Sequence, residues 1–551
     1  MKAKRSNLKR VFGVSLSALM LSLAVMPLAA CQQEGGKVDP NKTQFHIGNF
    51  DGGYGHTWIE QAAKKFEERY ADESFETGKT GVQIWINNAK DEYNSYEFYT
   101  TISGLEQDFF IAPQPRDEII ENELLIPIND LLDVSMAEFG ENKTVREKLA
   151  DWYKEAYLIS DVANDQNEET IYYLPTAEAY FGNIVYDIDL FEKEGYFIKE
   201  GGGWTSGVAN DKSAGMDGVK GTYDDGLPTT EDEFFALLDE IEGATPFTWA
   251  GQYPAYMNAF VFNLFCNYDD GLGQKLYNTL DGEYVIDGET VTFNGYNFTD
   301  TQRLPGRLAA LEVAERLVGN TSYYSREAFN TTQSHTEAQD EFLLSAKSGT
   351  PIAMLIEGTW WESEATETFN SMAQTDSKYG KKERRLGLMP VIRPDGSTGT
   401  KTNFITAAQA LFINGNTEHV DLAKKFMMYL LSDEIRELFT NVTGCPSPYD
   451  YKLSDSTYNN LSNFGKNLWE IHTNKDGNYN FITENRTSEA YKKDRGNYPY
   501  NFQAQVGEEL TSCPFTYFKF STGATAAKYF QGMQDLAKKR YDDYFAKYVV
   551  D

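Results

Sequence analysis

The sequence predicts an α/β protein with largely parallel sheets and more than one domain. Apolar runs of strand length alternate along the chain with amphipathic helical patterns, and this alternation is typical of parallel sheets. The chain also has 551 residues. Because a domain usually contains about 100 to 200 residues, we expect two to four domains rather than one small module.

The mature body is expected to open with a strand at residues 44–50, followed by a glycine-containing turn at 51–55. Further strands are expected at 82–86 and 108–112, where apolar residues cluster. In sheets of this kind, ligands bind beyond the carboxyl ends of the strands. The turn after the first strand is therefore expected to lie beside a cleft.

Two helix starts have the spacing of a capping box, Thr57 with Glu60 and Thr230 with Glu233. The first of these helices has an apolar stripe that recurs every four residues, formed by Trp58, Ala62, Phe66 and Tyr70. Another helix, at 432–442, is expected to end at the residues that follow it, Gly444 and Pro446.

The N-terminus has the layout of a secretory signal. Residues 1–10 carry five positive charges, while 11–30 carry none and are mostly apolar. Leu28-Ala29-Ala30-Cys31 resembles a bacterial lipobox, so we expect a signal peptide at 1–30, lipidation of Cys31 and a flexible tether at 31–43. A retained membrane helix is the alternative, because the apolar run is long enough to span a bilayer.

Charge and composition limit the partners. The formal net charge is −33, which argues against nucleic acid, since phosphate binding depends on clustered Lys and Arg. An anionic substrate is disfavoured for the same reason. The 35 Tyr and 35 Phe residues suggest a surface that stacks on a flat ligand.

No catalytic motif of the common hydrolase or nucleotide-binding classes occurs in the sequence. The five histidines are dispersed. We therefore expect no enzymatic activity, although the 83 Asp and Glu residues leave open the paired carboxylates of a glycoside hydrolase or polysaccharide lyase. Apart from Cys31, the cysteines are expected to be three separate buried thiols, or to include one bridge between Cys445 and Cys513.

The glycine-rich segment 201–226 is expected to be an insertion loop. Its carboxylates alternate with glycines as in calcium loops that use oxygen ligands, with Asp217, Asp224 and Asp225 as the candidate ligands. It lacks the order of an EF-hand, so an acidic turn without metal is the favoured alternative. No other cofactor is expected.

Six short stretches follow one another in a distinctive order: Gly53-Tyr54-Gly55 with Trp58; 125–132; 171–175 with Val185-Tyr186-Asp187; 228–234; 352–354 with Gly358-Thr359-Trp360; and 423–432 with Gly444-Cys445-Pro446. Together they resemble family 1 extracellular solute-binding proteins, the receptors of bacterial carbohydrate importers that include maltose-binding protein. Asp187 stands where the family usually has Asn. The likeness covers about residues 44 to 450.

The resemblance implies a two-lobed periplasmic-binding-protein fold of type II, with hinge-linked lobes and a ligand cleft between them. Lobe I would comprise 44–172 plus 389–445, and lobe II 173–388 plus 446–551, with hinges near Leu174-Pro175, Met389-Pro390 and Gly444 to Pro446. The implied function is a lipid-anchored receptor at the extracellular face of the membrane. It would capture a carbohydrate, an oligosaccharide in our interpretation, and deliver it to ABC permease subunits.

A sugar site needs aromatic planes for the ring faces and fixed polar groups for the hydroxyls. The resemblance points to Trp360 for stacking; Trp361 is its neighbour, and one of the two is expected to belong to the core. Trp249 and Tyr253 form a second aromatic candidate, equally compatible with core, and Tyr54 a third. The polar candidates are Glu178, for which a solvated loop acid is the alternative, and more weakly Asn49, Asp51, Gln114, Arg116 and Glu357.

Overall fold

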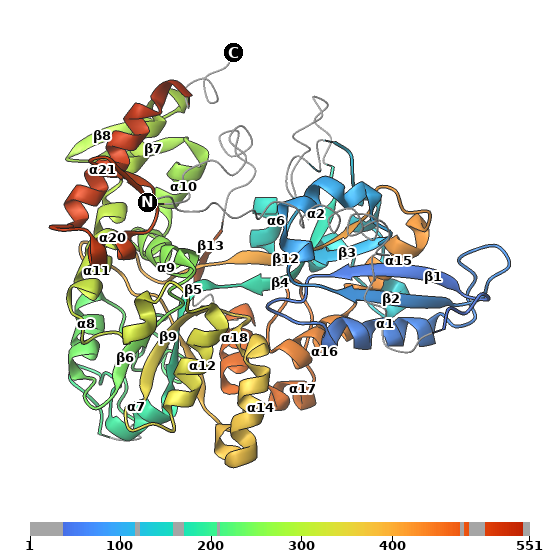
Figure 1. The fold of residues 1–551 in the computed structure, drawn as a ribbon, viewed down its shortest axis with the longest axis horizontal. Coiled ribbons are helices and arrows are strands. Elements are labelled where there is room, and N and C mark those ends of the chain that lie inside the picture. Colours follow the sequence, from blue (N-terminus) through green and yellow to red (C-terminus); the bar gives the residue numbers. More distant parts are fainter. Residues whose placement is uncertain are drawn as a thin grey trace, which may run out of the picture.

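The computed structural model describes residues 37–115, 119, 122–157, 170–206, 210–473, 479–483 and 502–543. Two separate sheets, each covered by helices, form two lobes that lie side by side (Figure 1). Within these residues, no helix is both long enough and apolar enough to cross a membrane. The leader and Cys31 lie outside the described residues.

The first lobe is built on a five-stranded sheet in which the chain returns twice after long excursions. Its order is β2 (Val82–Asn88), β1 (Thr43–Asn49), β3 (Phe109–Ala112), β12 (Thr406–Ile413) and β4 (Tyr173–Ala179). β1 runs parallel to β2 and β3, whereas β12 is antiparallel to β3 and β4. The sheet is therefore mixed rather than largely parallel, because its last two strands come from returning segments.

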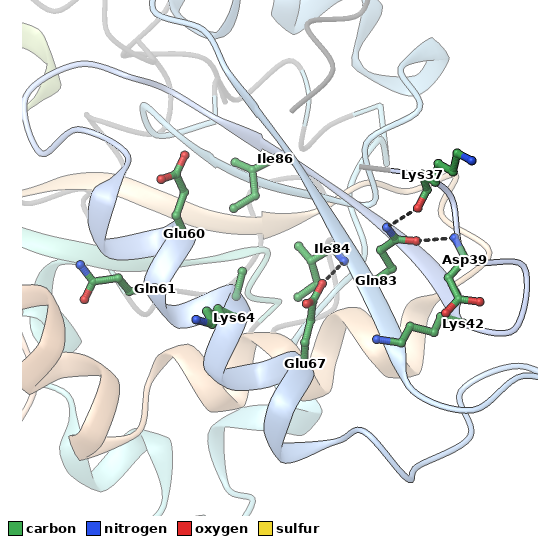
Figure 2. A pocket seen from close by; sticks show the side chains of 11 residues that line it. Lys37, Asp39, Lys42, Glu60, Gln61, Lys64, Glu67, Gln83, Ile84 and Ile86 are labelled. Carbon is green, nitrogen blue, oxygen red and sulfur yellow. Dashed lines mark hydrogen bonds between the residues drawn. The ribbon is translucent and has the colours of Figure 1, made fainter. Parts of the chain in front are cut away.

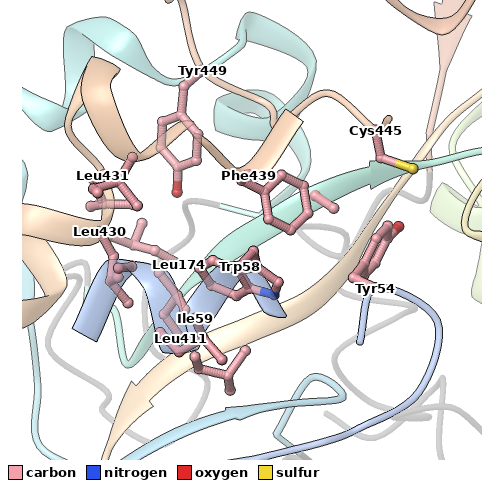
Figure 3. Packing of buried hydrophobic residues seen from close by; sticks show 14 of the residues in the cluster. Tyr54, Trp58, Ile59, Leu174, Leu411, Leu430, Leu431, Phe439, Cys445 and Tyr449 are labelled. Carbon is pink, nitrogen blue, oxygen red and sulfur yellow. The ribbon is translucent and has the colours of Figure 1, made fainter. Parts of the chain in front are cut away.

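Long helices pack against the first sheet: α1 (Thr57–Arg69), α15 (Val420–Leu430) and α16 (Asp433–Thr443). Shorter helices are α2 (Tyr96–Thr101), α4 (Asn129–Leu132), α5 (Val145–Lys148) and α6 (Asp151–Tyr157). The expected stripe of α1 is buried, and the Phe66 ring lies 5.0 Å from that of Phe426. Figure 3 shows Trp58 and Phe439 inside this core, with Tyr54 and Cys445 at its side.

Of the two predicted capping boxes, one is present in the structure and the other is not. Thr230 caps α8 (Glu231–Glu240) in a complete capping box with Glu233, as predicted. α1 begins at Thr57 as predicted, but its N-cap is His56, and no side chain caps it. Spacing alone could not distinguish an N-cap threonine from one at the first helical position. α16 ends at Gly444, whose left-handed φ of 80° suits glycine.

The second lobe contains a four-stranded sheet in the order β10 (Leu386–Met389), β5 (Phe181–Asp187), β9 (Ile352–Gly358) and β6 (Thr245–Thr248). β5 is antiparallel to both neighbours, and β6 is parallel to β9. Its helices are α7 (Ile188–Glu194), α8, α9 (Pro254–Asn267), α11 (Pro305–Gly319), α12 (His335–Ser345), α13 (Trp361–Glu364), α14 (Thr366–Thr375) and α18 (Asn463–Thr473).

Additional small elements enlarge the second lobe beside α9 and α11. They are α10 (Leu272–Thr279), the hairpin of β7 (Gly282–Ile286) and β8 (Glu289–Phe293), the hairpin of β14 (Ala504–Val506) and β15 (Glu509–Thr511), α20 (Pro514–Phe520) and α21 (Ala526–Lys539). Phe515 packs against Trp249 at 5.7 Å, so the C-terminal segment shares the core of this lobe. β11 (Thr402–Phe404) pairs with β13 (Asn480–Ile482), and α17 (Asp455–Asn460) lies beside α16.

The chain passes between the sheets three times. It leaves the first sheet at Tyr180, between β4 and β5, and returns between Met389 and Thr406. It leaves again after Gly444, and in the second lobe Asn467 of α18 accepts a hydrogen bond from Leu388 N–H at 3.2 Å. The first crossing therefore lies beyond the expected Leu174-Pro175. β4 is an edge strand, so Pro175 fits within it although it has no N–H.

Candidate functional site

Aromatic rings from separate segments meet where the two lobes face each other. Tyr54 follows β1 in the first lobe, and its ring centre lies 6.4 Å from that of Trp360, which follows β9 in the second. Phe181 begins β5 and lies 5.4 Å from Trp360 and 4.8 Å from Tyr256 of α9. Of these four rings, Tyr54 lies in the turn at 51–55 that follows β1.

Two glycines make room for the Trp360 ring. Gly53 has a φ of +64°, and a Cβ there would lie 3.2 Å from Trp360 Cγ. A Cβ at Gly358 would lie only 2.5 Å from the far edge of the same ring. The Gly-x-Trp pattern of residues 358–360 therefore has a direct steric cause, since the indole folds back over its own turn.

Two further rings, those of His335 and Tyr253, extend this group toward the surface. The His335 ring, at the start of α12, stacks near Tyr256 at 6.2 Å with an interplanar angle of 15°. Tyr253 lies 5.6 Å from His335 and is 40% exposed, whereas Tyr54 is 4% exposed and Tyr256 8%. We call the six residues Tyr54, Trp360, Phe181, Tyr256, His335 and Tyr253 the ring row. It leads from the buried lobe junction to solvent.

Glu364 of α13 connects the lobes beside this row. Its carboxylate accepts the Gly53 N–H of the first lobe at 3.1 Å and lies 3.5 Å from Lys90 Nζ of the same lobe. Within the second lobe, it lies 3.4 Å from His335 Nε2 and accepts Gln339 Nε2 at 3.1 Å. Burial alone raises the pKa of Glu364, but His335 and Lys90 outweigh burial and hold the pKa below its usual value.

Glu357, near the end of β9, is 1% exposed. Its oxygens accept Gly358 N–H at 3.0 Å and Gln339 Nε2 at 3.2 Å. Burial, followed by the nearby charge of Glu364, raises the pKa of Glu357 well above its usual value. Gln339 thus joins two carboxylates whose pKa values shift in opposite directions.

Glu178 of β4 lies on the other side of Tyr54. Tyr54 Oη donates to the Glu178 carbonyl oxygen at 3.3 Å, and the carboxylate lies 3.0 Å from His472 Nδ1 of α18. Glu178 is 3% exposed, and within the described residues its Oε2 has no hydrogen-bond partner. A solvated loop acid, the alternative considered for Glu178, does not fit this burial.

Two predicted stacking residues belong to the cores instead. Trp361 is fully buried and packs against Phe464 at 5.8 Å, because α13 begins there and turns it away from Trp360. Trp249 is 2% exposed and packs against Tyr324 at 5.3 Å. Trp58 is buried, as expected from its helical stripe.

The weaker polar candidates have local partners. Asp51 lies 3.0 Å from His56 Nδ1, Asn49 donates to Asn88 at 2.9 Å, and Gln114 donates to the Ala407 carbonyl at 3.2 Å. The structure does not bring these three into the ring row. Arg116 lies outside the described residues.

The candidate calcium loop uses its carboxylates to fold upon itself. Asp224 accepts the N–H groups of Met216 and Asp217 at 2.7 and 3.0 Å, and Asp225 accepts Gly221 N–H at 2.7 Å. Burial raises the pKa of Asp217 to about 6. In the part of the chain that the structure describes, no three His, Cys, Asp or Glu side chains are grouped as a metal ion requires.

A pocket on the first lobe lies away from the ring row (Figure 2). α1 and β2, the edge strand of the sheet, form its walls, and Glu67 accepts Ile84 N–H at 2.6 Å between them. Its lining mixes three lysines with three acidic side chains and two isoleucines. It offers neither aromatic rings nor buried unpaired polar groups.

Sequence reasoning missed Lys90, Phe181, Tyr256, His335 and Glu364. The carboxylate of Glu364 and the N–H of Gly53 are 311 positions apart in sequence, so no local pattern links them. Tyr256 was the easiest of these residues to find from sequence, because it follows the candidate Tyr253 at the start of a helix. Lys90 also follows a predicted strand end.

No family model matches the chain, and no curated protein matches it. Solved structures do share its fold. RafE in complex with raffinose is 16% identical with a TM-score of 0.53, over 92% of this chain and 99% of RafE. BlMnBP1, an ABC transporter binding protein from Bifidobacterium animalis in complex with mannobiose, is 14% identical with a TM-score of 0.53, over 91% and 95%.

A "probable secreted solute-binding lipoprotein" from Streptomyces coelicolor is 11% identical with a TM-score of 0.53, over 91% of this chain and all of that one. The two sheets and three crossings agree with these likenesses. The predicted two-lobed periplasmic-binding-protein fold of type II is confirmed.

Proposed function

We propose that the chain is the substrate-binding lipoprotein of a bacterial ABC importer, which captures a carbohydrate between its lobes and delivers it to membrane permeases. The ring row with its flanking carboxylates carries this proposal. Aromatic planes suit the apolar faces of sugars, and fixed polar groups suit their hydroxyls. Structures of the same fold in complex with raffinose and mannobiose support it.

The chain is proposed to bind its ligand without converting it. RafE and BlMnBP1, which share this fold, are binding proteins, and no observation favours the alternative of a glycoside hydrolase or lyase. Incubation of the purified protein with each sugar that it binds should leave that sugar intact. Products detected by chromatography would assign an enzyme instead.

We also propose that a lipid on Cys31 anchors the protein to the membrane. The lipobox-like end of the leader supports it, as does the secreted lipoprotein of the same fold. The Cys31→Ser variant should move from the membrane fraction to the soluble fraction of the producing cells. Equal membrane retention of the variant and the wild type would contradict lipid anchoring.

The decisive experiment is a thermal-shift screen of the Cys31→Ser protein against a panel of neutral oligosaccharides, followed by calorimetry. Trp360→Ala should weaken the binding of any hit by about tenfold or more, since stacked aromatic contacts contribute of the order of 1 kcal/mol or more. Tyr458→Ala removes an exposed ring of α17, which is not part of the ring row, and should leave the affinity unchanged. Unchanged affinity in Trp360→Ala would remove Trp360 from the site.

A further inference from the structure

Glu357 is a buried carboxylate that lacks a cation. It is 1% exposed and accepts two hydrogen bonds, from Gly358 N–H and Gln339 Nε2. Glu364 is the charged neighbour that acts on it, and in the part of the chain described no Lys, Arg or His pairs with it. An ionised carboxylate buried in this way is strongly disfavoured unless a positive group accompanies it.

Hydrogen-bond acceptors exceed donors around Glu357. The amide of Gln339 is fully buried and gives its Nε2 to both Glu357 and Glu364, while its Oε1 has no partner among the described residues. A site that offers mainly acceptors matches a group that only donates, and an ammonium has three donors and no acceptor.

The neighbouring carboxylate is already compensated. Glu364 lies 3.5 Å from Lys90 Nζ and 3.4 Å from His335 Nε2. The ammonium of Lys90 therefore reaches this cluster from the opposite lobe, which shows that the carboxylates attract such a group. Glu357 is the carboxyl group of this pair that has no cation beside it among the described residues.

Glu357 also lies beside the rings on which a sugar would stack. Burial raises the pKa of Tyr256, and the charges of Glu357 and then Glu364 raise it further, so the Tyr256 ring lies within the field of both carboxylates. The contacts of Glu364 with Gly53 and Lys90 join the two lobes beside this cluster, as does the hydrogen bond from Ser363 Oγ to the Thr443 carbonyl.

We propose that the carbohydrate taken by this site carries a cationic amino group, and that Glu357 is the counter-ion that selects it. This inference rests on the proposed function and specifies its ligand. A neutral sugar leaves Glu357 without a cation, and an anionic sugar adds repulsion from Glu357 and Glu364. An amino group at this position satisfies the charge of Glu357 and the unpaired oxygen of Gln339.

Binding of such an amino group should release a proton. The pKa of Glu357 is raised by burial and by Glu364, so the unliganded carboxyl tends to hold its proton. A cation beside Glu357 lowers that pKa again. Among the described residues, the other titratable groups facing the cluster are Tyr256 from α9, Tyr54 from the turn after β1, and His335 and Lys90, which act through Glu364.

The test compares amino derivatives with their neutral parent. The parent is the neutral oligosaccharide that binds in the panel above, and each derivative replaces one hydroxyl by an amino group. In calorimetry at about pH 6, where amines are charged, one derivative or more should bind at least about tenfold tighter than the parent. Titrations in buffers of different ionisation enthalpy should detect proton release for that derivative only.

Glu357→Gln should abolish both the preference for the amino derivative over the parent and the proton release. Glu362→Gln is the matched control. Glu362 is 2% exposed and burial raises its pKa, but it accepts Ser462 Oγ at 2.6 Å instead of facing Gln339. This control should keep the preference of the wild type.

Two results would overturn the inference and leave the carbohydrate receptor standing: amino derivatives that all bind no tighter than the parent, or a preference that survives Glu357→Gln. If no sugar of the panel binds the wild type, the proposed function fails and the inference fails with it.

Discussion

Removal of the Glu364 carboxylate should shift the unliganded protein toward a more open arrangement of its lobes. Glu364 belongs to the second lobe, and two of its partners, Gly53 N–H at 3.1 Å and Lys90 Nζ at 3.5 Å, belong to the first. Glu364→Ala deletes these two contacts between the lobes. The substitution leaves the two sheets and their cores intact, because α13 lies at the lobe junction.

The magnitude follows from these contacts. A hydrogen bond to a charged group contributes about 1.5 to 3 kcal/mol. The Lys90 side chain is 46% exposed, so solvent screening limits that ion pair to about 1 kcal/mol or less. A total of about 1.5 to 4 kcal/mol lowers the ratio of closed to open molecules by roughly 10-fold to 700-fold. A population that is mostly closed would become detectably open.

Spin-label distances measure this shift directly. Labels at Glu68→Cys on α1 and Glu240→Cys on α8 report on the two lobes, since both positions are exposed. Glu364→Ala should add a longer distance in the absence of ligand. The control, Glu367→Ala, removes an exposed acid from α14 in the same lobe and should reproduce the parent distribution. Identical distributions for Glu364→Ala and the parent would refute the reasoning.

Three further outcomes are expected. Glu357→Gln should stabilise the fold increasingly as pH rises from about 5 to 7, measured by urea unfolding, because the raised native pKa costs about 1.4 kcal/mol per pH unit above the unfolded pKa until the native pKa is reached; a gain that does not grow with pH would contradict the shift. A chelator should leave the melting temperature unchanged, since Asp217, Asp224 and Asp225 are occupied by backbone donors, whereas a drop reversed by calcium would establish a metal. Thiol titration of the unfolded Cys31→Ser protein should count the three free cysteines, and a count of one would indicate a bridge.

Local patterns in the sequence predicted much of the fold. The capping box at Thr230, the stop at Gly444 and the buried stripe of Trp58 depend on residues within one turn of each other, so propensity and spacing predict them. The crossing near Leu174-Pro175 was displaced, because a proline at the edge of a sheet need not interrupt a strand. The antiparallel strands β12 and β4 depend on long-range pairing, which periodicity does not reveal.

The candidate site was predicted in part. The turn after the first strand pointed to Tyr54 and the family resemblance pointed to Trp360; both lie at the lobe junction, with Glu178 and Glu357. Their role in binding stays a prediction. Trp361 and Trp249 could not be assigned from sequence, because which face of a turn or strand meets the core depends on packing partners such as Phe464 and Tyr324.

A second buried carboxylate shows why Glu357 is assigned a function rather than a structural role. Asp187 is also buried, but it pairs with Arg384 at 2.9 Å and caps α7 through Leu190 N–H at 3.1 Å. Arg384 also explains why an aspartate suits this position, where an asparagine would lack the charge. Asp187 therefore has the partners that a structural ion pair requires.

Glu357 has no such cation, and the amide that joins it to Glu364 leaves an oxygen unpaired. Native proteins pair almost all buried polar groups, and exceptions concentrate at functional sites. The junction between the lobes is the place where a ligand can supply the missing donor, since the ring row leads from there to solvent at Tyr253. If Glu357 served folding alone, Glu357→Gln would stabilise the fold and leave ligand selectivity unchanged. A gain in stability together with a loss of ligand selectivity would therefore assign Glu357 to ligand binding.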